Sequence, residues 1–369
     1  MQSTESDREL FRREVRRALE RLSPESAVRE LIDSPTGHDP ALWERLSVEL
    51  GLPGLAVPEQ FGGQGVGFAD LAVAVEESAR ALLCSPFPST ALATLALLRC
   101  PPSAGRDELL TGIAAGQTVV VMATGGSVTL SGSQLSATGL RAVDGQLADR
   151  FLISACTPDG RSLFVVDARD AGLTAAPLTV LDLTRRQAEL TLEEVPGVSL
   201  SGDFAAEGAA LLDLAALLAS AEIVAVATRA LELAVEHVRV RRQFGRPVGS
   251  FQAVKHLVAD AFAAVEQMRA AIDFAVAAVG SDALTDADRA ELTSVVKAYC
   301  SEAGPGVVET LIQVLGGTGF TWEHVAHLYL RKAKSLATAH GSARWHREWL
   351  AQLLDLTSLI ASERVGGPR

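Results

Sequence analysis

The chain has 369 residues, of which 48% are hydrophobic and 21% are charged, and its formal net charge is −12. This is the composition of a globular protein of two or three domains, and its acidic balance argues against nucleic acid or an anionic membrane surface as the main partner. The most apolar stretch, residues 211–228, contains Asp213 and Glu222. We therefore expect a buried helix there, with no membrane insertion.

Potential metal ligands are scattered along the chain. The cysteines at positions 84, 100, 156 and 300 form no C-x-x-C pair, so we expect free buried thiols in a reducing cytoplasm. His324 and His327 are three residues apart but lack a third ligand, which favours a pair on a helix surface over a metal site.

In chain order, the first third has the helical period. Apolar residues recur at helical spacing in residues 7–22, 40–50 and 68–83, and a loop rich in glycine and proline spans residues 51–65. From about residue 117 to 203 the segments are short and β-rich, separated by Gly, Ser and Asp, which indicates an antiparallel sheet or barrel.

From residue 204 the helical period returns. It predicts long helices over residues 208–241, 251–279, 286–315 and 342–359, and Thr285 with Asp288 resembles a capping box before the third. We expect Trp345 and His346 to pack inside the resulting bundle. The predicted fold is mainly α with a central β domain: an N-terminal helical domain (1–116), an antiparallel β domain (117–203) and a C-terminal helical bundle (204–369).

Four arginines, at positions 239, 241, 242 and 246, flank a Phe-Gly pair between two predicted helices. A guanidinium group can donate to two phosphate oxygens at once, so the segment could bind a phosphate. It could equally be a solvated basic helix end that complements the helix dipole.

A second segment, Gln313-Val-Leu-Gly-Gly-Thr-Gly-Phe320, has three glycines within four residues. Such a backbone can approach a flat or charged ligand closely, or simply end a helix in a tight turn. The spacing is not G-x-G-x-x-G and no strand precedes it, which argues against a Rossmann nucleotide site.

Together and in this order, these segments resemble the acyl-CoA dehydrogenase family. The resemblance covers nearly the whole chain and includes the Pro58-Glu-x-x-Gly-Gly-x-Gly65 loop, the helix–β–helix order, Arg241-x-x-Phe-Gly245, Gln313-x-x-Gly-Gly-x-Gly-Phe320 and Arg331-Lys-Ala-Lys334. It implies a tetramer, or a similarly built dimer, with FAD across a subunit interface. It also implies that Arg241 contacts the pyrophosphate of a neighbour's FAD beside Phe244, and that Gln313 and Gly317 line the adenosine half.

The pattern departs from the family at the catalytic base. Most members carry a glutamate nine residues after the arginine that matches Arg331, before Gly-Thr or Gly-Ser. That position holds His340 here, followed by Gly341 and Ser342, and the resemblance adds Ser342 to the cofactor-binding residues. A minority of members carry the base earlier, at a position that corresponds here to residues 214–216, where the chain has no carboxylate. Asp213 and Glu222 fall on other faces of that helix.

A second departure lies in the β domain. The family's Thr-Glu-Pro-x-x-Gly-Ser segment has no match, and its Trp-x-Thr segment has a serine in place of the tryptophan, so that only Thr138 remains. The segments that hold the flavin ring are thus degraded, whereas the residues that the resemblance assigns to a neighbour's FAD are intact. This contrast implies a division of labour. The chain resembles the non-catalytic subunit of heteromeric, steroid-type acyl-CoA dehydrogenases, with a partner subunit that supplies the base and the flavin pocket. Two alternatives stay open, a self-sufficient dehydrogenase with His340 as base and a non-redox structural or thioester-binding homologue.

Overall fold

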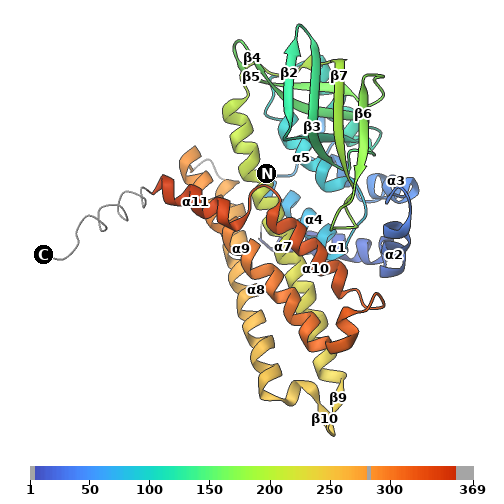
Figure 1. The fold of residues 1–369 in the computed structure, drawn as a ribbon, viewed down its shortest axis with the longest axis vertical. Coiled ribbons are helices and arrows are strands. Elements are labelled where there is room, and N and C mark those ends of the chain that lie inside the picture. Colours follow the sequence, from blue (N-terminus) through green and yellow to red (C-terminus); the bar gives the residue numbers. More distant parts are fainter. Residues whose placement is uncertain (1–4, 281–283, 355–369) are drawn as a thin grey trace, which may run out of the picture. The chain divides into compact units, whose positions relative to one another are not determined.

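The structure is a computed structural model that describes residues 5–280 and 284–354. The chain divides into two compact units, Met1–Leu211 and Leu212–Arg369 (Figure 1). Helices come first in the chain, strands follow, and long helices complete it. This order confirms the predicted fold class, a mainly helical protein with a central β domain.

The helical part of the first unit contains more helices than the sequence period predicted. Its elements are α1 (Glu5–Leu22), α2 (Glu25–Asp33), α3 (Pro40–Val48), η1 (Leu52–Gly54), η2 (Glu59–Phe61), α4 (Phe68–Arg80), α5 (Phe87–Leu97) and α6 (Ala104–Ala114). The periodicity identified α1, α3 and α4. It missed α5 because that helix is apolar on nearly every side and is buried, so it has no amphipathic stripe.

Charged side chains tie α1 to α4. Glu77 of α4 is 2% exposed and accepts two hydrogen bonds of 2.8 Å from Arg16. Arg12 donates to Glu76 and, at 3.3 Å, to Glu77. These hydrogen-bonded pairs compensate the burial of two carboxylates that would otherwise be costly.

Two four-stranded sheets make up the β part of the first unit, in the orders β1-β4-β5-β8 and β2-β3-β7-β6. The strands are β1 (Val120–Ala123), β2 (Ser127–Ser131), β3 (Gln134–Val143), β4 (Arg150–Thr157), β5 (Gly160–Asp167), β6 (Leu173–Leu178), β7 (Gln187–Pro196) and β8 (Val198–Ser199). Leu135 and Ala137, and after a register shift Leu140 and Ala142, are the buried residues of β3, as in a sheet with one face on a core.

Most strand pairs are antiparallel, as predicted, but β1 pairs with β4 in parallel. The parallel pair arises because the β2–β3 hairpin, which belongs to the other sheet, separates β1 from β4 in the chain. The predicted domain boundaries at 116/117 and 203/204 stay predictions. The boundary between the two compact units comes later in the chain, between residues 211 and 212, inside α7 (Ala205–Val240).

The second unit consists of α7 from residue 212 onward, a short hairpin of β9 (Arg242–Gln243) and β10 (Arg246–Pro247), η3 (Val248–Ser250), α8 (Gln252–Val279), α9 (Asp286–Leu315), η4 (Gly316–Phe320), α10 (Ala326–Thr338) and α11 (Ala343–Leu353). The Thr285–Asp288 capping box is present at the start of α9. Helix α10 was not predicted. The predicted continuation of α11 to residue 359 lies outside the described residues.

Helix α7 is long and apolar enough to cross a membrane by length and composition. However, 78% of its most apolar window is buried inside the protein, and the core helix of a globular protein passes the same test. This burial agrees with the predicted buried helix at residues 211–228. Among the described residues, α7 is the one helix that meets these criteria.

Candidate cofactor site

The arginine-rich segment forms a β-hairpin between α7 and α8. In Figure 1 the hairpin projects from the end of these two helices. Gln243 pairs with Arg246, so the turn has two residues, Phe244 and Gly245, and both have positive φ (51° and 78°). Positive φ at both central residues defines a type I′ turn, whose twist matches that of the flanking strands.

Phe244 combines two unfavourable features. Its side chain is 90% exposed, and its backbone is in the left-handed region, which disfavours a residue with a bulky side chain. Its ring stands edge-on to Phe251, with ring centroids 6.1 Å apart, and Arg246 lies 4.1 Å above the Phe251 ring. The exposed ring is therefore held in one place, as expected of a residue that contacts a ligand or a partner.

The four arginines in and beside the hairpin, at positions 239, 241, 242 and 246, are all exposed. None of them forms an ion pair with another residue that the structure describes, although Arg242 donates to the Gly245 oxygen at 3.4 Å. In a chain of net charge −12, this is a local concentration of unneutralised positive charge. The donor set fits a pyrophosphate such as that of FAD.

The glycine-rich segment ends α9. The Gly316 nitrogen donates to the Gln313 oxygen, and the chain continues into η4 with a positive φ of 63° at Gly316. Gln313 and Gly317 are exposed, and Phe320 is 79% exposed. The segment is thus a helix C-cap, one of the two predicted readings, and it also presents an open backbone and an aromatic ring to solvent.

His237, in the last turn of α7, interacts electrostatically with one residue from the hairpin side and one from beyond the glycine-rich segment. Its pKa is lowered first by burial and then by the charges of Arg241 and His324. His324 follows η4 closely in the chain, and the Arg241 nitrogen donates to the His237 oxygen at 2.9 Å. The end of α7 and the segment that follows η4 are therefore close enough for their charges to interact.

The third predicted segment is the turn between α10 and α11. His340 is exposed with φ 55°, and Gly341 follows with φ 102°. The Ser342 hydroxyl accepts a hydrogen bond of 3.2 Å from the Trp345 nitrogen and caps α11. His346 packs inside the bundle as predicted, whereas Trp345 is 52% exposed, so that part of the prediction was wrong. Trp345 lies on the outward face of a short, strongly amphipathic helix.

Thr138 lies in the first unit, apart in sequence from the other predicted residues. It is exposed near the middle of β3, opposite Ser127. Ser136, which the resemblance predicts at the place of the family's tryptophan, accepts a hydrogen bond of 3.2 Å from the Glu194 nitrogen. The serine hydroxyl therefore serves the pairing of two strands and offers none of the apolar area of an indole ring.

The two carboxylates considered as alternative bases both have partners. Asp213 accepts from Arg289 at 3.2 Å, and burial raises its pKa although Arg289 opposes the shift. Glu222 is 3% exposed and lies 4.0 Å from the ammonium nitrogen of Lys332 in α10. Both therefore act as structural ion-pair partners within the helical bundle.

The expected pair of histidines on a helix surface needs correction. His324 precedes α10, and its Nδ1 accepts from the Ala326 nitrogen at 3.1 Å, so His324 and His327 are not a helix-surface pair. Both are half-buried, and the ring of His327 packs against Trp322 with ring centroids 4.4 Å apart. No group of three or more metal-ligating side chains occurs in residues 5–280 and 284–354.

The cysteines form no disulfide, in agreement with the predicted free thiols. Three of them are buried, and burial raises the pKa of Cys100 to about 11 and of Cys300 to about 12, which disfavours the thiolate form. Cys156 is exposed, contrary to the prediction, because it points outward at the end of β4.

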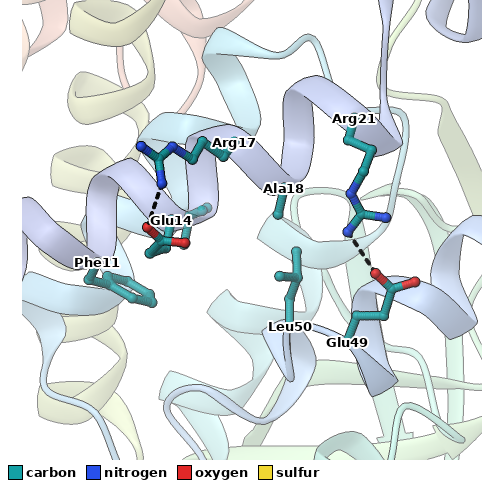
Figure 2. Close-up of a pocket in the computed structure, with 8 residues that line it drawn as sticks. Phe11, Glu14, Arg17, Ala18, Arg21, Glu49 and Leu50 are labelled. Atoms are coloured by element: carbon teal, nitrogen blue, oxygen red, sulfur yellow. Dashed lines mark hydrogen bonds and ion pairs between the residues drawn. The ribbon is translucent and has the colours of Figure 1, made fainter.

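A surface groove in the first unit does not coincide with any predicted site residue. Figure 2 shows it beside α1, close to the end of α3, with an ion pair from Arg17 to Glu14 and another from Arg21 to Glu49. Its charged side chains are already paired with one another. The groove therefore lacks arginines without an ion-pair partner, which are the feature that distinguishes the hairpin.

Fold and site together define a class of flavoprotein oxidoreductase. The family model for the acyl-CoA dehydrogenase C-terminal domain matches residues 208–354, and the model for the N-terminal domain matches residues 5–117. The chain belongs to the acyl-CoA dehydrogenase family.

Individual relatives support a steroid-type resemblance. The acyl-CoA dehydrogenase IpdE2 of Mycolicibacterium smegmatis is 35% identical over 339 residues, which cover 92% of this chain and 94% of the relative. The ChsE4-ChsE5 complex of Mycobacterium tuberculosis has a chain that is 26% identical, with a TM-score of 0.86 over 96% of this chain and 98% of that one. A variant of the Tcur3481-Tcur3483 steroid acyl-CoA dehydrogenase is 27% identical, with a TM-score of 0.85 over 96% and 99%.

Sequence reasoning did not identify the roles of three side chains that organise these segments. Phe251 supports Phe244 and Arg246 at the hairpin, while Lys297 and His346 bond to the turn that carries His340. Phe251 could have been found from its place just before a predicted helix that follows the arginines. Lys297 carried no signal, because it looks like any lysine on a helix.

Proposed function

We propose that this chain is a subunit of an FAD-dependent acyl-CoA dehydrogenase that acts together with a second, catalytic subunit. In this division of labour the chain completes the nucleotide site of the partner's FAD through Arg241, Phe244, Gln313 and Gly317. The partner supplies the carboxylate base and most of the flavin pocket.

The exposure of Phe244 in a left-handed turn is the observation that carries the proposal. An aromatic ring that is 90% exposed beside four arginines without described ion-pair partners is costly for an isolated chain. Contact with an anionic, aromatic nucleotide at a subunit interface would bury the ring and neutralise the charge.

The residues at the usual catalytic positions support the second half of the proposal. Position 340 is a histidine in an exposed turn, and the chain has Ser136 in place of the flavin-contacting tryptophan. Thr138 and Ser342 are the residues of this chain's own half-site that could still bind cofactor. When bound, FAD accepts the hydride from the acyl-CoA, while this chain's arginines hold the pyrophosphate and fix its orientation.

The relatives support a proposal for the substrate class. Because the solved complex that resembles the chain is named a steroid acyl-CoA dehydrogenase, we infer that the substrate is an acyl-CoA with a steroid-derived acyl group. The reaction would be α,β-dehydrogenation of that acyl group.

The decisive experiment is co-expression of the tagged chain with the product of an adjacent gene of the same family. Flavin is quantified by absorbance in the co-purified complex and in the chain purified alone. The proposal expects FAD in the complex and none in the isolated chain. A yellow, active chain without a partner would favour the self-sufficient enzyme, and a complex without flavin would favour a non-redox homologue.

A further inference from the structure

Two buried side chains converge on the end of α10, where the backbone leaves the helix. Lys297 of α9 is fully buried, and its ammonium group donates to the Leu336 oxygen at 2.9 Å and to the Ala337 oxygen at 3.4 Å. Its third bond, of 2.8 Å, goes to the Ser301 hydroxyl. All three protons therefore have acceptors, and the negative end of the α10 dipole favours the cation.

His346 of α11 bonds to the same turn from the other side. It is 3% exposed, its Nε2 lies 3.0 Å from the His340 oxygen, and its Nδ1 lies 3.0 Å from the Ser294 hydroxyl. A carbonyl oxygen can only accept, so Nε2 carries the proton. The neutral ring then accepts from Ser294 at Nδ1, which fixes both the tautomer and the orientation of the ring.

The turn itself needs such support. His340 and Gly341 have consecutive positive φ angles of 55° and 102°. A Cβ atom at position 341 would lie 2.6 Å from His346 Nε2 and 2.8 Å from Trp345 Cε3, so only glycine fits beneath the two rings. A non-glycine residue in the left-handed region persists where its surroundings determine its conformation.

We propose that Lys297 and His346 are positioning residues that clamp the backbone at position 340, the place of the base in this family. The clamp lies entirely within the second unit, so the chain fixes this turn before a partner or FAD binds. The inference rests on the proposed function, which gives the turn its place in the assembled enzyme.

Energetics favour positioning over stability as the reason for the clamp. Burial of an ammonium group and an imidazole is costly, and well-packed apolar side chains at such sites are often neutral or stabilising. What apolar side chains cannot do is hold three backbone oxygens, those of residues 336, 337 and 340, in fixed directions. The turn thus keeps a set geometry although its side chain at 340 is no longer a carboxylate.

The test compares His346→Leu with His346→Gln in the protein as it purifies with its partner. Hydrogen exchange is followed by mass spectrometry in peptides that cover residues 336–343, with peptides of α7 as the reference. The leucine variant loses both bonds and should speed exchange in the turn by roughly five- to tenfold. The glutamine variant can donate to the carbonyl and accept from the hydroxyl, so it should restore slow exchange.

A lysine pair provides the matched control. Lys297→Met should speed exchange in the same peptides, because the carbonyls of residues 336 and 337 lose their donor. Lys334→Met should not, because Lys334 lies on the outer face of α10, where it pairs with Glu309.

Equal exchange in the leucine and glutamine variants would overturn the clamp, as would a uniform increase throughout α7 and the turn. Both results would assign the side chains to general packing. Flavin content of the wild-type complex is measured on the same sample. A complex without flavin would refute the proposed function, while the exchange pattern would still decide whether the clamp exists.

Discussion

The ring of Phe244 stands edge-on to the ring of Phe251, with centroids 6.1 Å apart and planes 88° apart. This contact joins the tip of the β9–β10 hairpin to the residue that precedes α8. Arg246 lies over the other ring of the pair, so that the three side chains form one ordered unit. The hairpin is therefore pre-organised, which reduces the entropy lost when a ligand binds.

The first prediction follows from the sequence of this turn. Asn-Gly is preferred in type I′ turns because asparagine tolerates positive φ, whereas the chain has Phe244-Gly245. We expect Phe244→Asn to leave the melting temperature of the isolated chain unchanged or slightly higher. In the complex with the partner it should weaken FAD binding, measured by flavin fluorescence titration. A large loss of stability would mean that the ring is a folding element.

The second prediction concerns Arg241. We expect Arg241→Ala to weaken FAD binding in the assembled complex by about 1.5–3 kcal/mol, because a phosphate loses a charge-assisted hydrogen bond. Arg17→Ala removes the same charge from the exposed surface of α1, where Arg17 pairs with Glu14, and serves as the control. Equal, salt-sensitive losses in both variants would indicate a diffuse electrostatic effect without direct contact.

The third prediction concerns His340. If the partner supplies the base, His340→Ala should leave turnover by the complex nearly unchanged. A working histidine base would instead contribute on the order of 10²–10⁴-fold to the rate, and its removal would be evident in kcat. Steady-state kinetics of the complex with a steroid-type acyl-CoA, and with a short acyl-CoA for comparison, distinguishes the two outcomes.

The fourth prediction restores the carboxylate. We expect His340→Glu to remain inactive when the chain is purified without a partner, because under the proposed function Ser136 stands in place of the flavin-contacting tryptophan. The measurement is dehydrogenation with added FAD, together with the flavin content of the purified variant. Activity in the isolated variant would contradict the division of labour.

The fifth prediction concerns pH. Burial lowers the pKa of Lys297 to about 8, below that of an unfolded lysine, so the unfolded chain binds more protons above this pH. The free energy of unfolding should therefore rise with pH from about 8 upward, by at most about 1.4 kcal/mol per pH unit, relative to Lys297→Met. Denaturant unfolding of both proteins at pH 7, 8 and 9 measures the difference. A flat difference would mean that Lys297 titrates normally.

The sequence predicted much of the fold for a physical reason. Amphipathic periods and caps are local, so α8 and α9 were predicted to within a residue and the Thr285–Asp288 capping box was identified. The parallel pairing of β1 with β4 was not predicted, because it joins strands separated by a hairpin of the other sheet. Pairing of that kind depends on contacts between distant segments.

The sequence by itself determined the family resemblance and the order of the helical and β-rich parts. It also singled out positions 241, 244, 313 and 340 as candidate site positions. Those features are carried by residue type and spacing. The tertiary structure decided that Phe244 is exposed in a left-handed turn and that His346 reaches Ser294, 52 residues away in the chain. Burial and long-range hydrogen bonds exist only once the helices have packed, so no local pattern in the sequence encodes them.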